Sequence, residues 1–266
     1  MVTAMTIAGS DSGGGAGIQA DLKTFHAHGV FGTSIITALT AQNTLGVSAI
    51  HAVPPRFVVA QFIAVMDDIG THAAKTGMLA NAKIVRALGR ALRERPIPRL
   101  VVDPVMISKA GAALLEPDAI AALIEHILPL AAVVTPNLHE AAALIGIKAI
   151  RDLEGMALAA ERIRALGPQA VLIKGGHLPQ EDEAVDLLYD GSKTLEFRCE
   201  RLDQHHTHGT GCTYSAAITA GLARGLPLID AVRHAKTYIT EAIRTAPGLG
   251  SGVGPLNHFV DVDTPF

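Results

Sequence analysis

His208-Gly209-Thr210-Gly211-Cys212-Thr213 opens the stretch around which the chain is organised, and small apolar residues follow it as far as Gly225. Two glycines among small polar residues predict a turn that leads into the N-terminus of a helix. The first amide groups of a helix have no partner within it, and the helix dipole adds positive potential there. Such a terminus binds anions, most often phosphate. The stretch therefore predicts a phosphate site, and the structural alternative is a tight turn over a buried cysteine.

Cys212 lies at the mouth of this predicted site. The field that holds a phosphate also favours thiolate, so we predict a base or nucleophile whose pKa is lowered in the free protein. The alternative is a buried structural thiol, since free cysteine is commonly a core residue. Further along the helix, Ala217, Ala220 and Gly221 form a face of small residues, which predicts close packing against a sheet.

The composition indicates a large core built from aliphatic side chains. Apolar residues make up 49% of the 266 positions, aromatic residues only 4%, and Trp is absent. Ala, Val, Ile and Leu must fill such a core, as they do in parallel sheets covered by helices. A net charge of −3 gives no basic surface for nucleic acid. Two cysteines form no disulfide framework, and neither a secretory signal nor an apolar run of about 20 residues occurs. We therefore expect a soluble cytoplasmic protein without membrane or nucleic-acid partners.

Strand and helix patterns alternate along the chain. Strands are expected at 5–9, 34–40, 47–53, 73–77, 100–104, 132–137 and 170–176, and a hairpin at 184–189 and 194–200 around Asp190-Gly191. Helices are expected at about 18–28, 55–69, 82–94, 117–128, 138–145, 152–166, 210–224 and 227–244. This alternation favours an α/β fold in which a central, mostly parallel sheet is flanked by helices on both faces. With no linker or repeat, residues 1–266 are expected to form one domain.

Polar residues stand where three of the expected strands end. Asp103, Asn137 and Lys174 each follow an apolar run, and ligands of parallel sheets bind at the carboxyl ends of the strands. Asp103 and Glu140 offer carboxylates that suit Mg²⁺. Asn137 and Glu140 also have the spacing of a capping box, so that helix capping is the alternative. Lys174, before two glycines, fits either a phosphate contact or an ordinary lysine at a strand exit.

Other candidates carry weaker signals. The sequence contains neither the GxxxxGK[ST] pattern nor a G-x-G-x-x-G turn after a strand, so both common nucleotide motifs are absent. Asp11, with Gly13 to Gly15, fits either a contact to a substrate hydroxyl or a turn. Asp21 and Lys23 are expected on the solvated face of a helix. His205, His206 and His208 are close together, but without a second ligand cluster a zinc site is disfavoured.

The order of these motifs resembles one known family. Gly9-Ser10-Asp11 with the run from Gly13 to Thr24 is similar to the opening of the hydroxymethylpyrimidine/phosphomethylpyrimidine kinases of thiamine biosynthesis, in the ribokinase superfamily. Further matches run in the family's order: 37–44, 75–79, 103–106, 135–137 with Glu140, 174–177, 207–213 and 257–259. The Gly-Thr-Gly-Cys form is fairly specific, because many relatives have aspartate where this chain has Cys212.

The resemblance implies a ribokinase-like fold and a homodimer that uses ATP and Mg²⁺. The implied reaction transfers a phosphoryl group to the 5-hydroxymethyl group of 4-amino-5-hydroxymethyl-2-methylpyrimidine, and then a second one to the monophosphate.

Matching positions imply a role for each site residue. Cys212 would be the general base, the backbone of Gly209, Thr210, Gly211 and Cys212 the anion hole, and Asp103 and Glu140 the magnesium ligands. ATP would be bound by Asn137, Lys174, Thr207, Gly209 and Gly211, and the pyrimidine by Gly9, Asp21, Gln42, Met78 and Val105. Residues 108–111 resemble the family's lid.

Two alternatives remain open at this stage. A pyridoxine or pyridoxal kinase of the same superfamily also acts on a ring hydroxymethyl group. A non-catalytic metabolite-binding module would be expected to have lost Cys212, Asp103, Glu140 or Lys174, and all four are present. One departure is Ser12-Gly13, where the family more often has Pro-Ser or Ser-Ser, and a more flexible turn there predicts a looser pocket.

Overall fold

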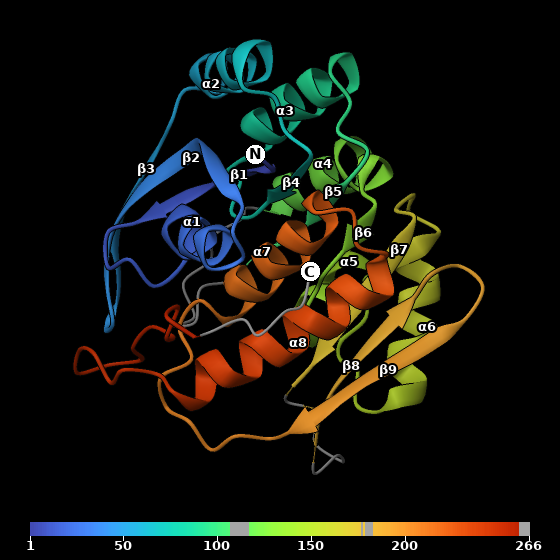
Figure 1. Ribbon diagram of the computed structural model, residues 1–266. Helices are drawn as coiled ribbons and strands as arrows, with labels where there is room; N and C mark the ends of the chain where they lie inside the picture. The colour runs from blue at the N-terminus through green and yellow to red at the C-terminus, as the bar shows by residue number, and fades with distance from the viewer. Residues whose placement is uncertain (107–116, 177, 179–182, 261–266) are drawn as a thin grey trace.

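One nine-stranded sheet forms the centre of the computed structural model, which describes residues 1–106, 117–176, 178 and 183–260 (Figure 1). The strand order is β3-β2-β1-β4-β5-β6-β7-β8-β9. The strands are β1 (Thr3–Asp11), β2 (Phe31–Asn43), β3 (Gly46–Ala52), β4 (Ala73–Thr76), β5 (Leu100–Val102), β6 (Val133–Val134), β7 (Ala170–Gly175), β8 (Glu183–Tyr189) and β9 (Thr194–Glu200). Strands β2, β1, β4, β5, β6 and β7 pair in parallel, whereas β3, β8 and β9 join antiparallel. The prediction of a mostly parallel sheet is confirmed.

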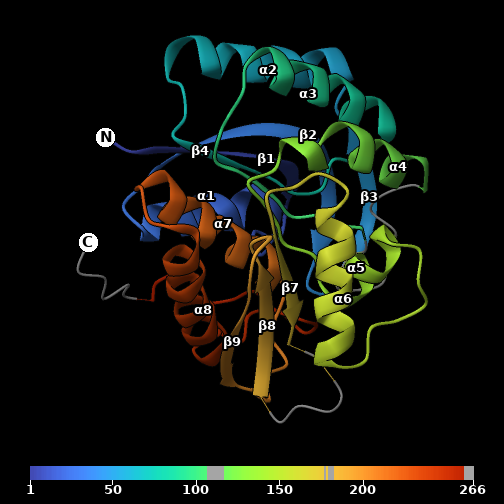
Figure 2. The ribbon, with the colours of Figure 1, turned by 90° about the vertical axis from the view of Figure 1, so that its right-hand side faces the viewer.

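Helices cover both faces of this sheet, as predicted. They are α1 (Gly17–Ala27), α2 (Pro55–Asp68), α3 (Ala82–Glu94), α4 (Pro117–His126), α5 (Leu138–Leu144), α6 (Leu153–Arg164), α7 (Thr210–Ala223) and α8 (Leu228–Arg244), with a short 3-10 turn at Leu128–Leu130. Figure 2 shows α1, α7 and α8 on one side of the sheet and α5 and α6 on the other. One sheet runs through all nine strands, which fits the expected single domain; that expectation stays a prediction.

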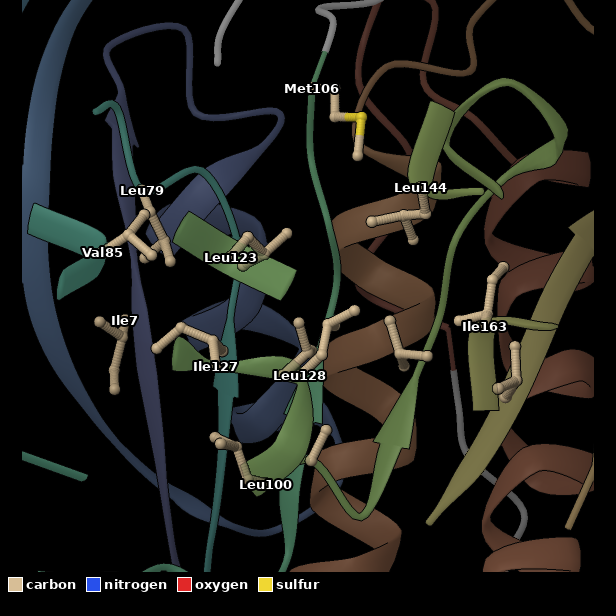
Figure 3. Close-up of a cluster of buried hydrophobic side chains, with 14 of the residues drawn as sticks. Ile7, Leu79, Val85, Leu100, Met106, Leu123, Ile127, Leu128, Leu144 and Ile163 are labelled. Atoms are coloured by element: carbon tan, nitrogen blue, oxygen red, sulfur yellow. The ribbon is translucent and has the colours of Figure 1, made fainter. Parts of the chain in front are cut away.

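The core consists of two apolar layers separated by the sheet. Successive side chains of a strand point to opposite faces, so that Met5 and Ile7 of β1 join the layer under α2 to α6, while Ala4 joins the layer under α1, α7 and α8. Figure 3 shows part of the first layer, where Leu123, Ile127 and other aliphatic side chains pack together. A sheet buried on both faces explains why the strands read as apolar runs rather than as alternating ones.

Helix α7 is buried along almost its whole length, from Thr213 to Ala223. The face of small residues on this helix was predicted to pack on the sheet. For Gly221 that prediction is wrong. A Cβ atom added at Gly221 would lie 3.0 Å from the Cβ of Ala231 in α8. The glycine thus allows two helices to approach each other, a contact between neighbouring helices that the local pattern did not specify.

Strands β1 and β2 extend further than the apolar pattern predicted. Their pairing continues through Ser10 with Leu39 and Asp11 with Thr40, because backbone pairing needs no apolar side chains. Strand β2 then runs on to Asn43 and pairs with β3. This β2–β3 ribbon leaves Leu39, Leu45 and Ile50 exposed.

The hairpin at Asp190-Gly191 forms as predicted. Asp190 Oδ1 accepts hydrogen bonds from the amides of Ser192 and Lys193, both at 2.9 Å, and Gly191 adopts a φ of 95°. The turn joins β8 to β9, the last two strands in the order of the sheet (Figure 1).

Candidate active site

The predicted turn into a helix is confirmed at Gly209. This residue precedes α7 with a φ of 85°, in the left-handed region, and a Cβ atom there would overlap the carbonyl oxygen of Gly15. Only glycine fits both conditions. The Thr210 hydroxyl donates to the carbonyl of Thr207 at 2.8 Å and fixes the entry to the helix. Figure 1 shows that this helix lies beside α1.

The first turn of α7 is open to an anion. The first helical bond runs from the amide of Thr213 to the carbonyl of Gly209, at 2.8 Å. Within the described part of the chain, the backbone amides of Gly211 and Cys212 donate no hydrogen bond to a backbone carbonyl. Unpaired amides at the positive end of a helix are what a phosphate group requires.

Lys174 lies directly against this turn. Its Nζ atom donates to Asp103 Oδ1 at 2.8 Å, and it would be 3.2 Å from a Cβ atom on Gly211. Burial lowers the pKa of the Lys174 ammonium, but the carboxylates of Asp103 and Glu140 outweigh it and raise the pKa overall. The lysine is therefore a persistent cation beside the unpaired amides. It lies within β7 rather than at a simple strand exit.

Asp103 follows β5 and is almost wholly buried. Its carboxylate accepts from the hydroxyls of Thr135 at 3.2 Å and Ser215 at 3.3 Å, in addition to Lys174. Burial alone would raise the pKa of Asp103, but the nearby ammonium groups of Lys174 and Lys75 lower it. Asp103 is thus ionised in the ordinary pH range.

Asn137 and Glu140 form the complete capping box that was the structural alternative. Asn137 Oδ1 accepts from the Glu140 amide at 2.9 Å, and Glu140 Oε2 accepts from the Asn137 amide at 2.8 Å. Burial raises the pKa of Glu140 to about 7, with the charge of Asp103 adding to the rise and Lys174 opposing it. The cap and a metal contact are compatible, because a carboxylate has several lone-pair positions.

Cys212 lies close to both of the buried ion pairs at this site. Its carbonyl accepts from Lys75 Nζ at 3.3 Å, and the backbone of Gly17 forms a hydrogen bond with its thiol. The prediction of a lowered pKa is wrong. Burial raises the pKa of the thiol to about 11; Lys75 opposes the rise, while the carboxylates of Asp21 and Asp103 add to it. The prediction considered the helix terminus and left out burial of the thiol, which is the largest contribution to its pKa.

The ion pair of Lys75 and Asp21 was missed by the sequence analysis. Lys75 Nζ donates to Asp21 Oδ1 at 2.7 Å, and both side chains have 0% exposure. Thr6 Oγ1 also donates to Asp21, at 2.5 Å. The expectation of a solvated Asp21 is therefore wrong, whereas Lys23 is exposed as expected. The available signal was a lone lysine in an apolar strand, since buried lysines are almost always paired.

Four of the residues assigned to the pyrimidine lie at or near the ends of strands, whereas Asp21 lies on α1. A Cβ atom on Gly9 would be 3.1 Å from the sulfur of Met78, whose carbonyl accepts from Thr37 Oγ1 at 2.6 Å. Gln42 lines a surface hollow of about 470 Å³ on the β2–β3 ribbon. Val105 is partly exposed just beyond Asp103, from whose carbonyl its amide is 2.9 Å distant.

Asp11 forms the turn that was its structural alternative. Its carboxylate accepts from the amides of Gly13, Gly15 and Ala16 at 2.8 to 3.0 Å, and His208 Nε2 lies 2.9 Å from Oδ2. Burial would raise the pKa of Asp11, but the hydrogen bonds from His208 and these amides lower it.

The turn at Ser12-Gly13 contacts the end of β2, and the looser pocket expected from this departure stays a prediction. Ser12 Oγ donates to the Gln42 carbonyl and accepts from the Gln42 amide, both at 2.8 Å. A Cβ atom at Gly13 would be 3.3 Å from the same carbonyl oxygen. The turn therefore lies against the end of β2.

Three other expectations concern a lid, a metal cluster and the membrane. The predicted lid at 108–111 lies outside the described residues. Within the described ranges, no group of three or more His, Cys, Asp or Glu side chains is arranged to hold a metal ion. Among the helices described, none combines the length and the apolar character needed to cross a bilayer.

Comparisons with known proteins place the chain in a family. The family model for phosphomethylpyrimidine kinase matches residues 11–257. A hydroxymethylpyrimidine/phosphomethylpyrimidine kinase of Rhizobium meliloti is 54% identical over 258 residues, with 96% of each chain covered.

Two solved structures resemble the fold described above. A phosphomethylpyrimidine kinase from Clostridium difficile has a TM-score of 0.82 at 46% identity, covering 91% of this chain and all of the other. A Bacillus subtilis pyridoxal kinase in complex with ADP has a TM-score of 0.91 at 41% identity, covering 97% of each chain. With the family model spanning most of its length and relatives near half identity, this chain belongs to the phosphomethylpyrimidine kinase family.

Proposed function

We propose that this protein transfers the γ-phosphoryl group of ATP to the hydroxymethyl oxygen of 4-amino-5-hydroxymethyl-2-methylpyrimidine. It then phosphorylates the monophosphate to the diphosphate, as a step of thiamine biosynthesis. The observation that carries the proposal is the open first turn of α7, which contains Cys212 and has the Lys174 ammonium beside Gly211. The relatives at about half identity name the same substrates.

The proposed step needs a nucleophile, a base and a charge-stabilising site. The substrate oxygen forms a bond to the γ-phosphorus, the bond from that phosphorus to the bridging oxygen breaks, and ADP leaves with the bond electrons. The hydroxyl proton passes to Cys212 Sγ when this group is a thiolate. The amides of Gly211 and Cys212 and the Lys174 ammonium stabilise the charge on the transferred group.

Magnesium fits the donor set of the site. Mg²⁺ takes oxygen ligands and usually needs only one or two protein carboxylates beside phosphates and water. Asp103 provides an ionised carboxylate, and Glu140 a buried one whose pKa is raised by burial to about 7. When bound there, Mg²⁺ would neutralise charge on the phosphates of ATP.

Glu140→Gln is expected to raise the Mg²⁺ concentration for half-maximal turnover about 10-fold, an order typical of weakening one ligand. The glutamine oxygen still accepts the Asn137 amide, so the helix cap is retained. Titration of turnover with Mg²⁺ in the variant and the wild type measures the shift. Full turnover of the wild type in excess EDTA would contradict the metal assignment.

Gln42→Ala is expected to raise KM for the pyrimidine and to leave KM for ATP nearly unchanged. A carboxamide can pair with both a ring nitrogen and an exocyclic amine, and losing such contacts costs about 1–3 kcal/mol in transition-state stabilisation. Steady-state kinetics with each substrate varied in turn provide the measurement. An unchanged kcat/KM for the pyrimidine would remove Gln42 from the pocket.

Product analysis tests the proposed function as a whole. Incubation of the protein with ATP and hydroxymethylpyrimidine should give the monophosphate first and the diphosphate later. Pyridoxal should be assayed in parallel, since a pyridoxal kinase is among the most similar folds. Turnover of pyridoxal alone would favour the alternative kinase, and absence of turnover with either alcohol would favour a binding module.

The homodimer and the cytoplasmic location also belong to the proposal. The β2–β3 ribbon exposes Leu39 at 47%, Leu45 at 69% and Ile50 at 43%, and β3 is an edge strand. Apolar side chains gathered on an edge favour contact with a second copy. Leu39→Asp is expected to shift the molecular mass in sedimentation from dimer to monomer.

The cytoplasmic location is supported by the cysteines. Cys199 and Cys212 are both free thiols, which suits a reducing compartment.

A further inference from the structure

His208 contacts two side chains through one ring nitrogen, which would have to be a donor for one contact and an acceptor for the other. Its Nε2 atom lies 2.9 Å from Asp11 Oδ2 and 3.1 Å from Gln42 Nε2. A protonated Nε2 donates to the carboxylate but cannot accept from the Gln42 amino group. An unprotonated Nε2 accepts from the amino group but then faces the carboxylate with a lone pair.

The other side of the Gln42 amide shows the same conflict. The Thr40 hydroxyl lies 3.0 Å from the Ser10 carbonyl and 3.1 Å from Gln42 Oε1. Both are acceptors, and a hydroxyl carries one proton.

Turning the amide over resolves both conflicts at once. The oxygen and nitrogen of a carboxamide are distinguished by their hydrogen-bond partners rather than by shape. With Oε1 toward His208, the Nε2 proton of the imidazole is shared between Asp11 and Gln42. The Gln42 amino group then donates to Thr40 Oγ1, and the Thr40 proton stays on Ser10. Every donor has an acceptor, and His208 decides which way the amide points.

A fixed amide presents its free donor and acceptor in one order. One lone pair and one N–H of Gln42 are taken by His208 and Thr40, which leaves one of each for a ligand. Gln42 also lines the hollow on the β2–β3 ribbon, together with Ser12, and the proposed function places the pyrimidine ring against its remaining donor and acceptor. An aminopyrimidine edge offers a ring nitrogen beside an amine, an acceptor next to a donor. A pyridoxal ring has a hydroxyl and no such amine.

We propose that His208 is a specificity-determining positioning residue, which orients Gln42 for an aminopyrimidine and against a pyridoxal-type ring. The inference rests on the proposed function, since it takes Gln42 as part of the substrate pocket. His208 itself touches Gln42 and Asp11 and acts through Gln42.

The test is the ratio of kcat/KM for hydroxymethylpyrimidine to kcat/KM for pyridoxal. His208→Phe keeps a ring but removes the N–H, and should lower this ratio about 10–100-fold, the range for one mispaired polar contact. His208→Gln restores an N–H at a similar reach and should keep the ratio within about threefold of the wild type. His205→Phe, at an exposed histidine three residues earlier, is the matched control and should not change the ratio.

Thr40→Val removes the second anchor and should also lower the ratio, so the inference remains testable if His208→Phe does not fold. In a Gln42→Ala background, neither change should lower the ratio further. An unchanged ratio in Gln42→Ala alone would contradict the proposed pocket. A ratio that falls in Gln42→Ala but not in folded His208→Phe or Thr40→Val would overturn the role of His208.

Discussion

Cys212→Ala is expected to bind both substrates and to lose about 10²–10⁴-fold in kcat, the usual contribution of a positioned base. A primary alcohol is a poor nucleophile near neutral pH, and Cys212 is held at the open turn of α7 by the backbone of Gly17. Cys212→Asp should recover part of the loss, because a carboxylate there can accept the same proton. Rapid-quench measurement of the phosphorylated pyrimidine gives the rate of the chemical step.

The raised pKa of Cys212 adds a pH dependence to this expectation. With a thiol pKa of about 11, the thiolate fraction grows about 10-fold for each pH unit through the neutral range, and kcat/KM should rise with it. The rise should vanish in Cys212→Ala. Cys199→Ala, at the other free thiol, should behave as the wild type at every pH. Wild-type kcat in well-folded Cys212→Ala would reject the base.

Gly211→Ala is expected to lower kcat/KM about 10²–10³-fold, as does the loss of one donor from an oxyanion site. The added methyl group would stand 3.2 Å from Lys174 Nζ and 3.6 Å from Asp103 Oδ2, in the space between the lysine and the first turn of α7. A phosphate cannot then reach both the amides and the ammonium. Steady-state kinetics with ATP varied, together with thermal unfolding, test this expectation.

The same substitution elsewhere in α7 provides the matched control. Gly211→Ala should keep or slightly raise Tm, because alanine is the better helix former by about 1 kcal/mol. Gly221→Ala should do the reverse, since its Cβ atom would press on Ala231 and lower Tm while the folded protein keeps its kcat. Near wild-type kcat/KM in Gly211→Ala would show that phosphate does not bind at this turn.

Elements whose signal lies within their own residues were predictable from the sequence. The hairpin at Asp190 and the capping box at Asn137 depend on contacts over a few positions, and both formed as the patterns indicated. The alternation of apolar strands with helices was sufficient for the sheet, because buried parallel strands are continuous apolar runs.

Properties set by distant residues were not predictable. The burial of Asp21 depends on Lys75, 54 positions away, and a helical pattern alone places that aspartate in solvent. The pKa of Cys212 is raised first by burial of the thiol, and Lys75, Asp21 and Asp103, which come from other elements, modify that rise. The contact of Gln42 with His208 joins residues 166 positions apart, so no local sequence motif predicts it.

The joining of the chain's beginning and end at the site has a consequence for biosynthesis. All nine strands are complete at Glu200, before the ribosome has made α7. Until that helix is made, the apolar face formed by Ala4, Ala73, Val101, Val133 and Ala170 lacks the cover that α7 provides. The contact of Asp11 with His208, across 197 positions, can form only then. Packing of α7 thus covers the exposed apolar surface of the nascent chain and forms the phosphate-binding turn in the same step. A chain that stalls before this step is inactive, and its exposed apolar surface makes it a target for chaperones.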